Sequence, residues 1–201
     1  MTAHPARTRT PSVKVEKVLL GAAEQVLKRD GPKAVTIRAV AAEAKVAPMG
    51  VYSRFGGKEG LAQALRTQGF ERLRQAVTDV DGSDAITRLG AAGIGYREFA
   101  LANPHLYLAM FEDSMGIGPD ALRSNESGDA AFNELVGHVR NVLLQISAPA
   151  KDPVEIAQQI WAAVHGAVLL EIKGLVVTPD PNATYLSLLE LLIGGVIKPA
   201  P

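Results

Sequence analysis

Apolar residues recur at helical spacing along most of the chain. Strict alternation of apolar and polar residues, which is typical of a half-buried strand, never extends beyond a few positions. The helical period of three or four residues is clear from the first predicted helix, at Val15, Val18, Leu19, Ala22, Val26 and Leu27. The pattern therefore predicts an all-α protein.

Turn residues divide this pattern into about nine helices. Asp30-Gly31-Pro32 is expected to end the first helix, Thr36 to cap the second and Ala47-Pro48 to open the third. Residues 113–129 are rich in Gly, Ser, Asp and Asn, so we expect a mobile loop there. The helices are predicted at residues 15–29, 37–44, 48–55, 58–80, 84–102, 104–112, 130–146, 154–176 and 183–197.

Charge is distributed unevenly although the formal net charge is zero. Residues 1–60 contain 11 Lys and Arg against 5 Asp and Glu, a net charge of +6, and residues 61–201 contain 10 against 16, a net charge of −6. A basic N-terminal part on an acidic remainder indicates a polyanionic partner for the N-terminal part alone. Chance clustering on solvated faces is the alternative.

Several classes of site find no support in the sequence. The chain has no Cys, which excludes disulfides and thiolate metal sites, and its four His residues are scattered. There is no nucleophile elbow, phosphate-binding loop or dinucleotide fingerprint. We therefore expect no metal, no cofactor and no enzymatic activity.

The sequence also gives no sign of a membrane segment. The most apolar window, residues 161–177, is interrupted by His165, Glu171 and Lys173, and no apolar stretch near the N-terminus is long enough for a signal peptide. A cytoplasmic protein without membrane contact is the expectation.

Two short helices joined by a tight turn, residues 37–44 and 48–55, form a candidate helix-turn-helix. The second helix of such a unit enters the major groove of DNA, and Pro48, Met49 and Gly50 are small or flexible enough at its start. Three packed helices with no role in nucleic-acid binding are the alternative interpretation.

Residues 15–61 resemble the N-terminal domain of the TetR family of bacterial repressors. The most specific similarity is a Tyr-x-x-Phe-x-x-Lys-x-x-Leu pattern, formed here by Tyr52, Phe55, Lys58 and Leu61. In the rest of the chain, Asn103-Pro104, Met110-Phe111 and the segment Trp161 to Gly166 resemble the C-terminal class that carries a Trp…His-Gly motif. The resemblance implies a DNA-binding head at residues 13–60 and a ligand-binding, dimerising body at 61–201. Residues 1–12 mix Thr, Arg, Pro and Ala without periodicity, so we expect a disordered basic arm there.

The resemblance also implies roles for individual residues of the head. Phosphate contacts are expected from the second helix, from Tyr52 and from the start of the fourth helix, and base contacts from the third helix. The DNA-binding residues expected in this way are Thr36, Arg38, Lys45, Met49, Gly50, Tyr52, Ser53, Arg54 and Lys58.

Two positions depart from the family pattern. Lys45 stands in the turn where the family usually has Gly, because the turn favours a left-handed backbone, and a Lys there should cost about 1 kcal/mol. Ala47 stands where Ser or Thr usually caps the third helix, and Ala cannot cap. These departures support an alternative function, a helical ligand-binding or adaptor protein with a degenerate DNA-binding head.

A group of mainly aromatic residues in the body is expected to form a ligand pocket. Trp161 and His165 lie one helical turn apart and would form a wall with a polar group. A filled core with a hydrogen-bonded His is the alternative. The expected ligand-binding residues are Tyr96, Phe99, Met110, Phe111, Trp161 and His165.

The last two predicted helices, residues 154–176 and 183–197, are apolar on too many sides for surface helices. We expect them to form a four-helix bundle with a second copy of the chain. Burial of the last helix within one subunit is the alternative. Together with the resemblance, the sequence predicts a homodimeric repressor that binds a palindromic operator in double-stranded DNA and is released by a small apolar ligand.

Overall fold

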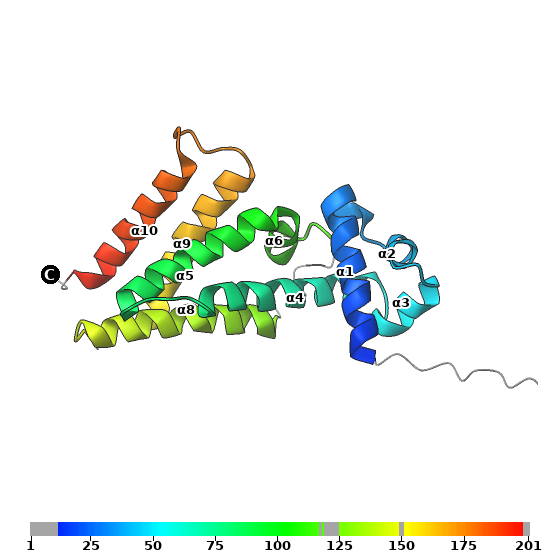
Figure 1. Ribbon diagram of the computed structural model, residues 1–201, viewed down its shortest axis with the longest axis horizontal. Coiled ribbons are helices and arrows are strands. Elements are labelled where there is room, and N and C mark those ends of the chain that lie inside the picture. Colours follow the sequence, from blue (N-terminus) through cyan, green and yellow to red (C-terminus); the bar gives the residue numbers. More distant parts are fainter. Residues whose placement is uncertain (1–11, 117, 119–124, 149–150, 199–201) are drawn as a thin grey trace, which may run out of the picture.

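All regular structure in the described part of the chain is helical, as predicted (Figure 1). The computed structural model describes residues 12–116, 118, 125–148 and 151–198. The expected arm at residues 1–12, apart from Ser12, and part of the expected loop at 113–129 lie outside these residues. The elements are α1 (Ser12–Asp30), η1 (Pro32–Ala34), α2 (Ile37–Glu43), α3 (Pro48–Phe55), α4 (Lys58–Thr78), α5 (Ala85–Ala102), α6 (Pro104–Phe111), α8 (Glu126–Gln145), α9 (Pro153–Ile172) and α10 (Pro181–Ile197).

Helices α1, α2 and α3 form the head at one end of the molecule (Figure 1). Thr36 caps α2 as predicted, with its hydroxyl oxygen 3.2 Å from the amide nitrogen of Ala39. One apolar side of each helix meets the others and the start of α4. The most deeply buried residues of this core are Ala23, Val26, Leu27, Val40, Ala41, Val51 and Leu61.

Helix α4 connects the head to the body. Its 21 residues extend about 30 Å, and one end packs against α1 and α3 while the rest packs against α5, α6 and α8. Leu61, Leu65, Leu73 and Val77 form its buried apolar side. Any displacement of α4 in the body therefore reaches the head through one continuous helix.

The body consists of α5, α6, α8, α9 and α10 packed around the distal part of α4 (Figure 1). Helices α9 and α10 lie side by side at the end of the molecule away from the head. Arg97 of α5 joins this pair to the body, because its guanidinium donates to the Glu171 carboxylate of α9 at 2.6–3.2 Å and to Asn182 of α10 at 2.8 Å.

Two helix boundaries differ from the predicted ones by four residues. Helix α8 begins at Glu126 rather than residue 130, because the Asn125 side chain caps the segment that its Ser and Gly content had suggested was loop. Helix α9 ends at Ile172 rather than residue 176, because Gly174 adopts a left-handed backbone (φ 66°) that stops the helix. The proposed dimer helices are therefore Pro153–Ile172 and Pro181–Ile197.

Among the described residues, none forms a helix that is both long and apolar enough to cross a membrane.

Candidate functional site

The turn between α2 and α3 has the geometry that the sequence predicted. The amide of Val46 donates to the Ala41 carbonyl at 2.9 Å and that of Lys45 to the Ala42 carbonyl at 3.2 Å, which is the Schellman arrangement of a helix end. Lys45 has a left-handed backbone with φ 56°, and Ala47 makes no side-chain cap on α3. The turn thus forms without the residues that favour it most.

Helix α3 presents a polar and flexible face to solvent and an apolar one to the head core. Val51 is fully buried, whereas Met49 and Tyr52 are 71% and 54% exposed. Gly50 and Ser53 are also exposed, and the Ser53 hydroxyl donates to the Gly50 carbonyl at 3.2 Å. The residues predicted to face DNA therefore share one accessible side of the helix.

Gly50 lies in the first turn of α3, and nothing in the described structure requires a glycine there. A Cβ atom at this position would meet no atom within 4 Å. At Gly60, by contrast, a Cβ would lie 1.9 Å from the Phe55 carbonyl oxygen. Because Gly in a helix costs about 0.5–1 kcal/mol relative to Ala, its presence on the exposed face is consistent with close approach of another molecule.

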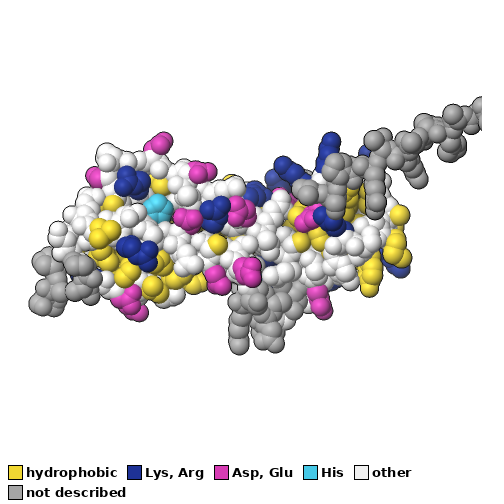
Figure 2. Space-filling model, turned by 90° about the horizontal axis from the view of Figure 1, so that it is seen from below, with side chains coloured by type: hydrophobic (Ala, Val, Ile, Leu, Met, Phe, Trp, Pro, Cys, Tyr) yellow, Lys and Arg dark blue, Asp and Glu magenta, His cyan; other side chains and the backbone are white. Residues whose placement is uncertain are grey.

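The predicted cationic contacts fall into two groups. Arg38, Lys45 and Lys58 are exposed, and Lys58 is the first residue of α4. Arg54 is half-buried and forms an ion pair with Glu16 of α1, so it also ties α3 to the rest of the head. Figure 2 shows Lys and Arg side chains projecting at the head end, and Asp and Glu interspersed with them over the body.

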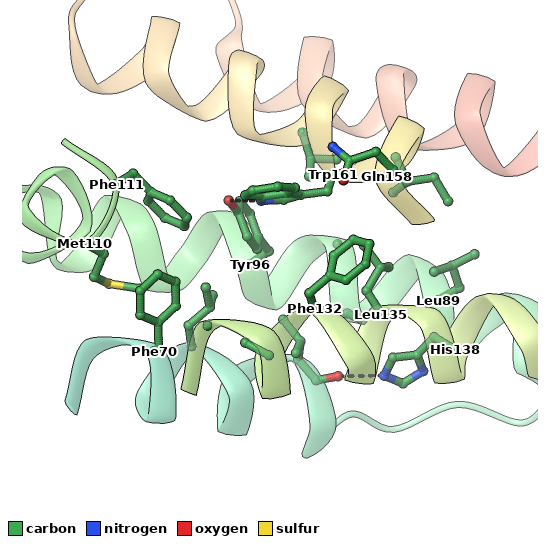
Figure 3. Close-up of a pocket in the computed structure, with 18 of the residues that line it drawn as sticks. Phe70, Leu89, Tyr96, Met110, Phe111, Phe132, Leu135, His138, Gln158 and Trp161 are labelled. Atoms are coloured by element: carbon green, nitrogen blue, oxygen red, sulfur yellow. Dashed lines mark hydrogen bonds between the residues drawn. The ribbon is translucent and has the colours of Figure 1, made fainter. Parts of the chain in front are cut away.

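A cavity of about 390 Å³ lies within the body, between α4, α5, α6, α8, α9 and α10 (Figure 3). This volume suits a small organic ligand. Its walls are mainly apolar. They are formed by Arg66, Phe70, Leu73, Val77, Leu89, Ala92, Gly93, Tyr96, Met110, Phe111, Asn125, Gly128, Asp129, Ala131, Phe132, Leu135, His138, Gln158, Ile160, Trp161, Val164, Leu189, Leu192 and Ile193.

The structure places four of the six predicted ligand-binding residues in these walls: Tyr96, Met110, Phe111 and Trp161. Phe99 and His165 are not wall residues. Phe99 is buried elsewhere, with the Arg72 guanidinium 5.8 Å from its ring centroid. His165 lies behind the wall, where its ring stacks edge-on against Phe111 at 4.6 Å.

His165 belongs to a hydrogen-bonded cluster that starts at the cavity, in which the Tyr96 hydroxyl also lies 3.1 Å from Nδ1 of His165. The Trp161 indole nitrogen donates to the Tyr96 hydroxyl at 3.2 Å, the Tyr96 and Tyr107 hydroxyls are 2.7 Å apart, and Tyr107 is 2.7 Å from Nδ1 of His165. With its proton on Nε2, the neutral imidazole accepts from Tyr107. We call these four side chains the tyrosine relay.

Burial sets the protonation states of the relay. It raises the pKa of Tyr96 to about 12, against the opposing effect of hydrogen bonds from Tyr107 and Trp161. It also raises the pKa of Tyr107 and lowers the pKa of His165 below its ordinary value of 6.5, while the Glu112 carboxylate acts on His165 in the opposite direction. At neutral pH both tyrosines therefore keep their protons and His165 is neutral.

Several wall residues were not predicted from the sequence. Phe70 of α4 and Phe132 of α8 complete the aromatic lining with Phe111 and Trp161, at ring-centroid separations of 5.3 Å and 6.0 Å. The available signal was the helical register, since Phe70 continues the apolar side of α4 marked by Leu73 and Val77. Which helix faces the cavity follows only from the tertiary fold.

The wall also contains a buried cation. Arg66 is 2% exposed, and its guanidinium donates to the Met110 carbonyl at 3.1 Å and to the Gln63 side chain at 3.1 Å. Burial lowers the pKa of Arg66, and the nearby Asp113 carboxylate opposes that effect. Among the described residues there is no group of three or more Asp, Glu and His side chains placed to hold a metal ion.

Helices α9 and α10 both carry exposed apolar residues. Val154 and Leu170 on α9 are 50% and 49% exposed, and Leu191 on α10 is 72% exposed. Leu186 and Ile197 of α10 are exposed as well. Large apolar side chains exposed on two neighbouring helices favour a surface that another protein covers.

Comparison with known proteins identifies both parts of the chain. Residues 19–65 match the family described as bacterial regulatory proteins, tetR family, and residues 89–192 match the tetracyclin repressor-like C-terminal domain. An HTH-type transcriptional regulator of Mycobacterium tuberculosis is 25% identical over 174 residues, covering 85% of this chain and 76% of that protein.

Solved structures share the fold over nearly the whole chain. A protein of unknown function from Rhodococcus sp. RHA1 has a TM-score of 0.79 at 24% identity, covering 98% of this chain and all of that one. A TetR regulator from Streptomyces coelicolor has a TM-score of 0.70 at 17% identity, covering 90% and 96%. The two family matches show that the chain belongs to the TetR family, whose members are DNA-binding transcriptional regulators and not enzymes.

Proposed function

We propose that the protein is a homodimeric repressor that binds a palindromic operator and is released when a small apolar ligand enters the body cavity. In this proposal residues 13–60 form the DNA-binding head, residues 61–201 form the ligand-binding and dimerising body, and the protein acts in the cytoplasm. The observation that carries the proposal is α4, which joins an exposed helix-turn-helix to the wall of an apolar cavity.

The head supports DNA binding through the exposed side of α3. Met49, Gly50 and Ser53 would approach base edges, and Tyr52 would donate its hydroxyl proton to a phosphate. Thr36, Arg38, Lys45, Arg54 and Lys58 would hold the phosphate backbone around them. The two heads of a dimer would occupy half-sites roughly 34–36 Å apart.

The exposed apolar residues of α9 and α10 support dimerisation. Two copies packed through these helices would form a four-helix bundle about a two-fold axis. The separation of the two heads would then depend on how each α4 leaves its body. A ligand that binds better to one separation of the heads would shift the population toward it.

The binding test uses fluorescent DNA from upstream of the protein's own gene, at two salt concentrations and against scrambled competitor DNA. We expect binding that resists the competitor and weakens steeply with salt, because phosphate contacts release counterions. Weak binding that is equal on both DNAs would contradict the proposal and favour the alternative of a ligand-binding or adaptor protein with a degenerate head.

Gly50→Ala separates DNA contact from folding. The new methyl meets no protein atom within 4 Å and improves helix propensity, so the free energy of unfolding should be unchanged or higher. DNA affinity should fall by about 10-fold or more if α3 enters the groove at this residue. Gly137→Ala on α8 is the matched control, since its Cβ is also unobstructed. Equal DNA affinity for both variants would exclude Gly50 from the interface.

Release is tested by adding the apolar ligand once a binder of the cavity is known. Operator affinity should decrease by the ratio of the ligand's affinities for the free and the DNA-bound protein. A ligand that binds tightly and leaves operator affinity unchanged would contradict the proposed switch.

A further inference from the structure

The cavity opens to solvent on the side that α8 and α9 form. Of its 24 wall residues in the described part of the chain, two are exposed, Asp129 of α8 and Gln158 of α9. The wall residues that α4 contributes are all buried, so that wall is closed. A ligand in the cavity therefore meets solvent beside these two polar side chains.

Each exposed residue precedes an aromatic ring by three positions. Phe132 follows Asp129 on α8 and Trp161 follows Gln158 on α9, and residues three apart in a helix lie on the same side. Both rings are half-buried wall residues, and their centroids are 6.0 Å apart. Figure 3 shows Gln158 beside Trp161, with Phe132 below them. We call these four residues the rim.

The hydrogen-bond donors in the interior of the wall are used within the protein or lie out of reach. The Trp161 indole donates to the Tyr96 hydroxyl, which belongs to the tyrosine relay. His138 donates from Nε2 to the Val77 carbonyl at 2.8 Å, which leaves its Nδ1 as an acceptor. The Nδ2 atom of Asn125 has no partner, but it is buried with almost no accessible surface. The part of a ligand inside the cavity is therefore best apolar.

The positive charge of the wall is also compensated within the protein. Arg66 is 2% exposed, and its guanidinium donates to the Met110 carbonyl and to the Gln63 side chain. The Asp113 carboxylate lies close enough to raise the pKa of Arg66 against the effect of burial. An anionic ligand therefore finds no exposed cation in the described wall.

The rim offers acceptors and a negative charge. The side chains of Asp129 and Gln158 form no hydrogen bond or ion pair with the described residues. A carboxylate only accepts hydrogen bonds, and the Gln amide both accepts and donates, so a ligand group beside the two has to be a donor. Two further features favour a cation there: the faces of the two rings attract positive charge, and residues 61–201 have a net charge of −6.

We infer that the natural ligand is an amine, whose apolar body fills the cavity and whose ammonium group lies at the rim, where it donates to Asp129 and Gln158 beside the rings of Phe132 and Trp161. Alkyl and arylalkyl amines have this chemistry. The inference names the ligand class of the proposed function and rests on the cavity's proposed role as the ligand site.

Calorimetric titration with three matched probes tests this assignment. Phenylbutylamine, phenylbutanol and phenylbutyrate, each with its head group at the end of the chain, share one ring and one chain length. The head group is a cation, a neutral hydroxyl and an anion respectively at neutral pH. We expect the amine to bind about 10-fold more tightly than the carboxylate, with the alcohol between them, because the rim attracts one charge and repels the other.

Asp129→Asn removes the negative charge of the rim. The ratio of amine to carboxylate affinity should fall from about 10-fold to about 3-fold or less. Asp129 lies in the first turn of α8, where a carboxylate also stabilises the helix, but that role does not distinguish one probe from another. Glu98→Gln makes the same chemical change at an exposed position of α5 outside the wall and should keep the wild-type ratio.

Gln158→Met removes the amide of the rim and keeps the length of the side chain and its helix propensity. The amine and the alcohol should both bind about 3-fold more weakly, because the amide serves either head group. Gln159→Met is the matched control, since Gln159 is exposed one position further along α9, is not a wall residue and bonds to Glu155.

Three results would overturn the inference: a carboxylate probe that binds as tightly as the amine, a wild-type ratio that survives Asp129→Asn, or unchanged amine affinity in Gln158→Met. Failure of all three probes to bind would overturn it as well. Because the titrations contain no DNA, their result is independent of the operator experiment. Tight binding of the carboxylate alone would reject the amine and leave the cavity as the ligand site of the proposed function.

Discussion

Three residues occupy the same position in three helix ends. Lys45 after α2, Ser147 after α8 and Gly174 after α9 have φ values of 56°, 56° and 66°, and each helix ends with the same pair of backbone hydrogen bonds. Only one of the three is a glycine, although a left-handed backbone costs a residue with a Cβ about 1–2 kcal/mol. Two of these ends are therefore strained by their side chains.

Replacement of Lys45 by Gly should raise the free energy of unfolding by about 1 kcal/mol, because the strain at φ 56° is removed. The measurement is urea denaturation followed by circular dichroism. Ser147→Gly is the matched control. It should raise the free energy of unfolding by a similar amount and leave operator binding unchanged. Lys45→Gly should also weaken operator binding and reduce its salt dependence, since one phosphate contact is lost. Unchanged DNA binding would exclude Lys45 from the interface.

The half-buried His165 makes stability depend on pH. Its pKa in the folded protein lies below 6.5, so the unfolded chain takes up more protons as the pH falls through that value. The contribution of the neutral His165 to the free energy of unfolding is therefore complete above about pH 6.5 and decreases below it. The free energy of unfolding, measured between about pH 7.5 and 5, should decline less steeply for His165→Gln. Identical slopes for the two proteins would contradict the assignment.

Individual residues also show which roles can be predicted from the sequence and which cannot. Thr36 and Lys45 were predictable because their roles depend on neighbouring backbone alone. Asn125 was not, because an Asn in a segment rich in Ser and Gly is recognisable as a cap only when the helix after it is known. His165 was placed on the correct side of α9, but the tyrosines that separate it from the cavity come from other helices.

At the scale of helices, Arg72 of α4 is a junction between head and body. Its guanidinium donates to Glu24 of α1 at 2.9 and 3.0 Å and to the Asn103 side chain, between α5 and α6, at 2.7 Å. A single side chain thus connects the head to the corner of the body from which α6 leads toward the cavity. This junction was not visible in the sequence, since its members lie 31 and 48 residues apart.

Arg72→Leu should destabilise the packing of α1 on the rest of the molecule and leave the body unchanged. Loss of these partly exposed contacts is worth about 1 kcal/mol, so amide hydrogen exchange in α1 should accelerate about five-fold. Arg74→Leu is the matched control, because Arg74 pairs only with Glu71 and Glu134 among its ion pairs, both within the body. Faster amide hydrogen exchange in α1 for both variants would mean that α4 as a whole, rather than Arg72, stabilises the head against the body.

At the scale of the whole molecule, the exposed apolar residues of α9 and α10 indicate the expected assembly. Leu191→Glu should raise the dimer dissociation constant by about 100-fold or more, because each subunit would bury a charge in the bundle. Sedimentation equilibrium measures the change. Leu144→Glu replaces an equally exposed leucine, 65% accessible, on α8 and should leave the dimer intact. If Leu144→Glu dissociates the dimer and Leu191→Glu does not, the interface does not lie on α9 and α10.

The overall architecture was predictable because it depends on long periodic patterns. The helices of the described residues, the head and the apolar excess of the last two helices all follow from residue spacing and from turn residues such as Gly31 and Pro104. The cavity was only partly predictable, because its walls come from six helices and a void depends on where side chains fail to meet.

Trp161 is the only tryptophan of the chain, and it stands in the cavity wall with its indole nitrogen bonded to Tyr96. The intrinsic emission of the whole protein at tryptophan wavelengths is therefore an optical signal from one side chain at one place. A compound that enters the cavity should alter the intensity or colour of that emission, while a compound that binds elsewhere should not. The protein carries its own reporter for a ligand screen, with no dye or label attached.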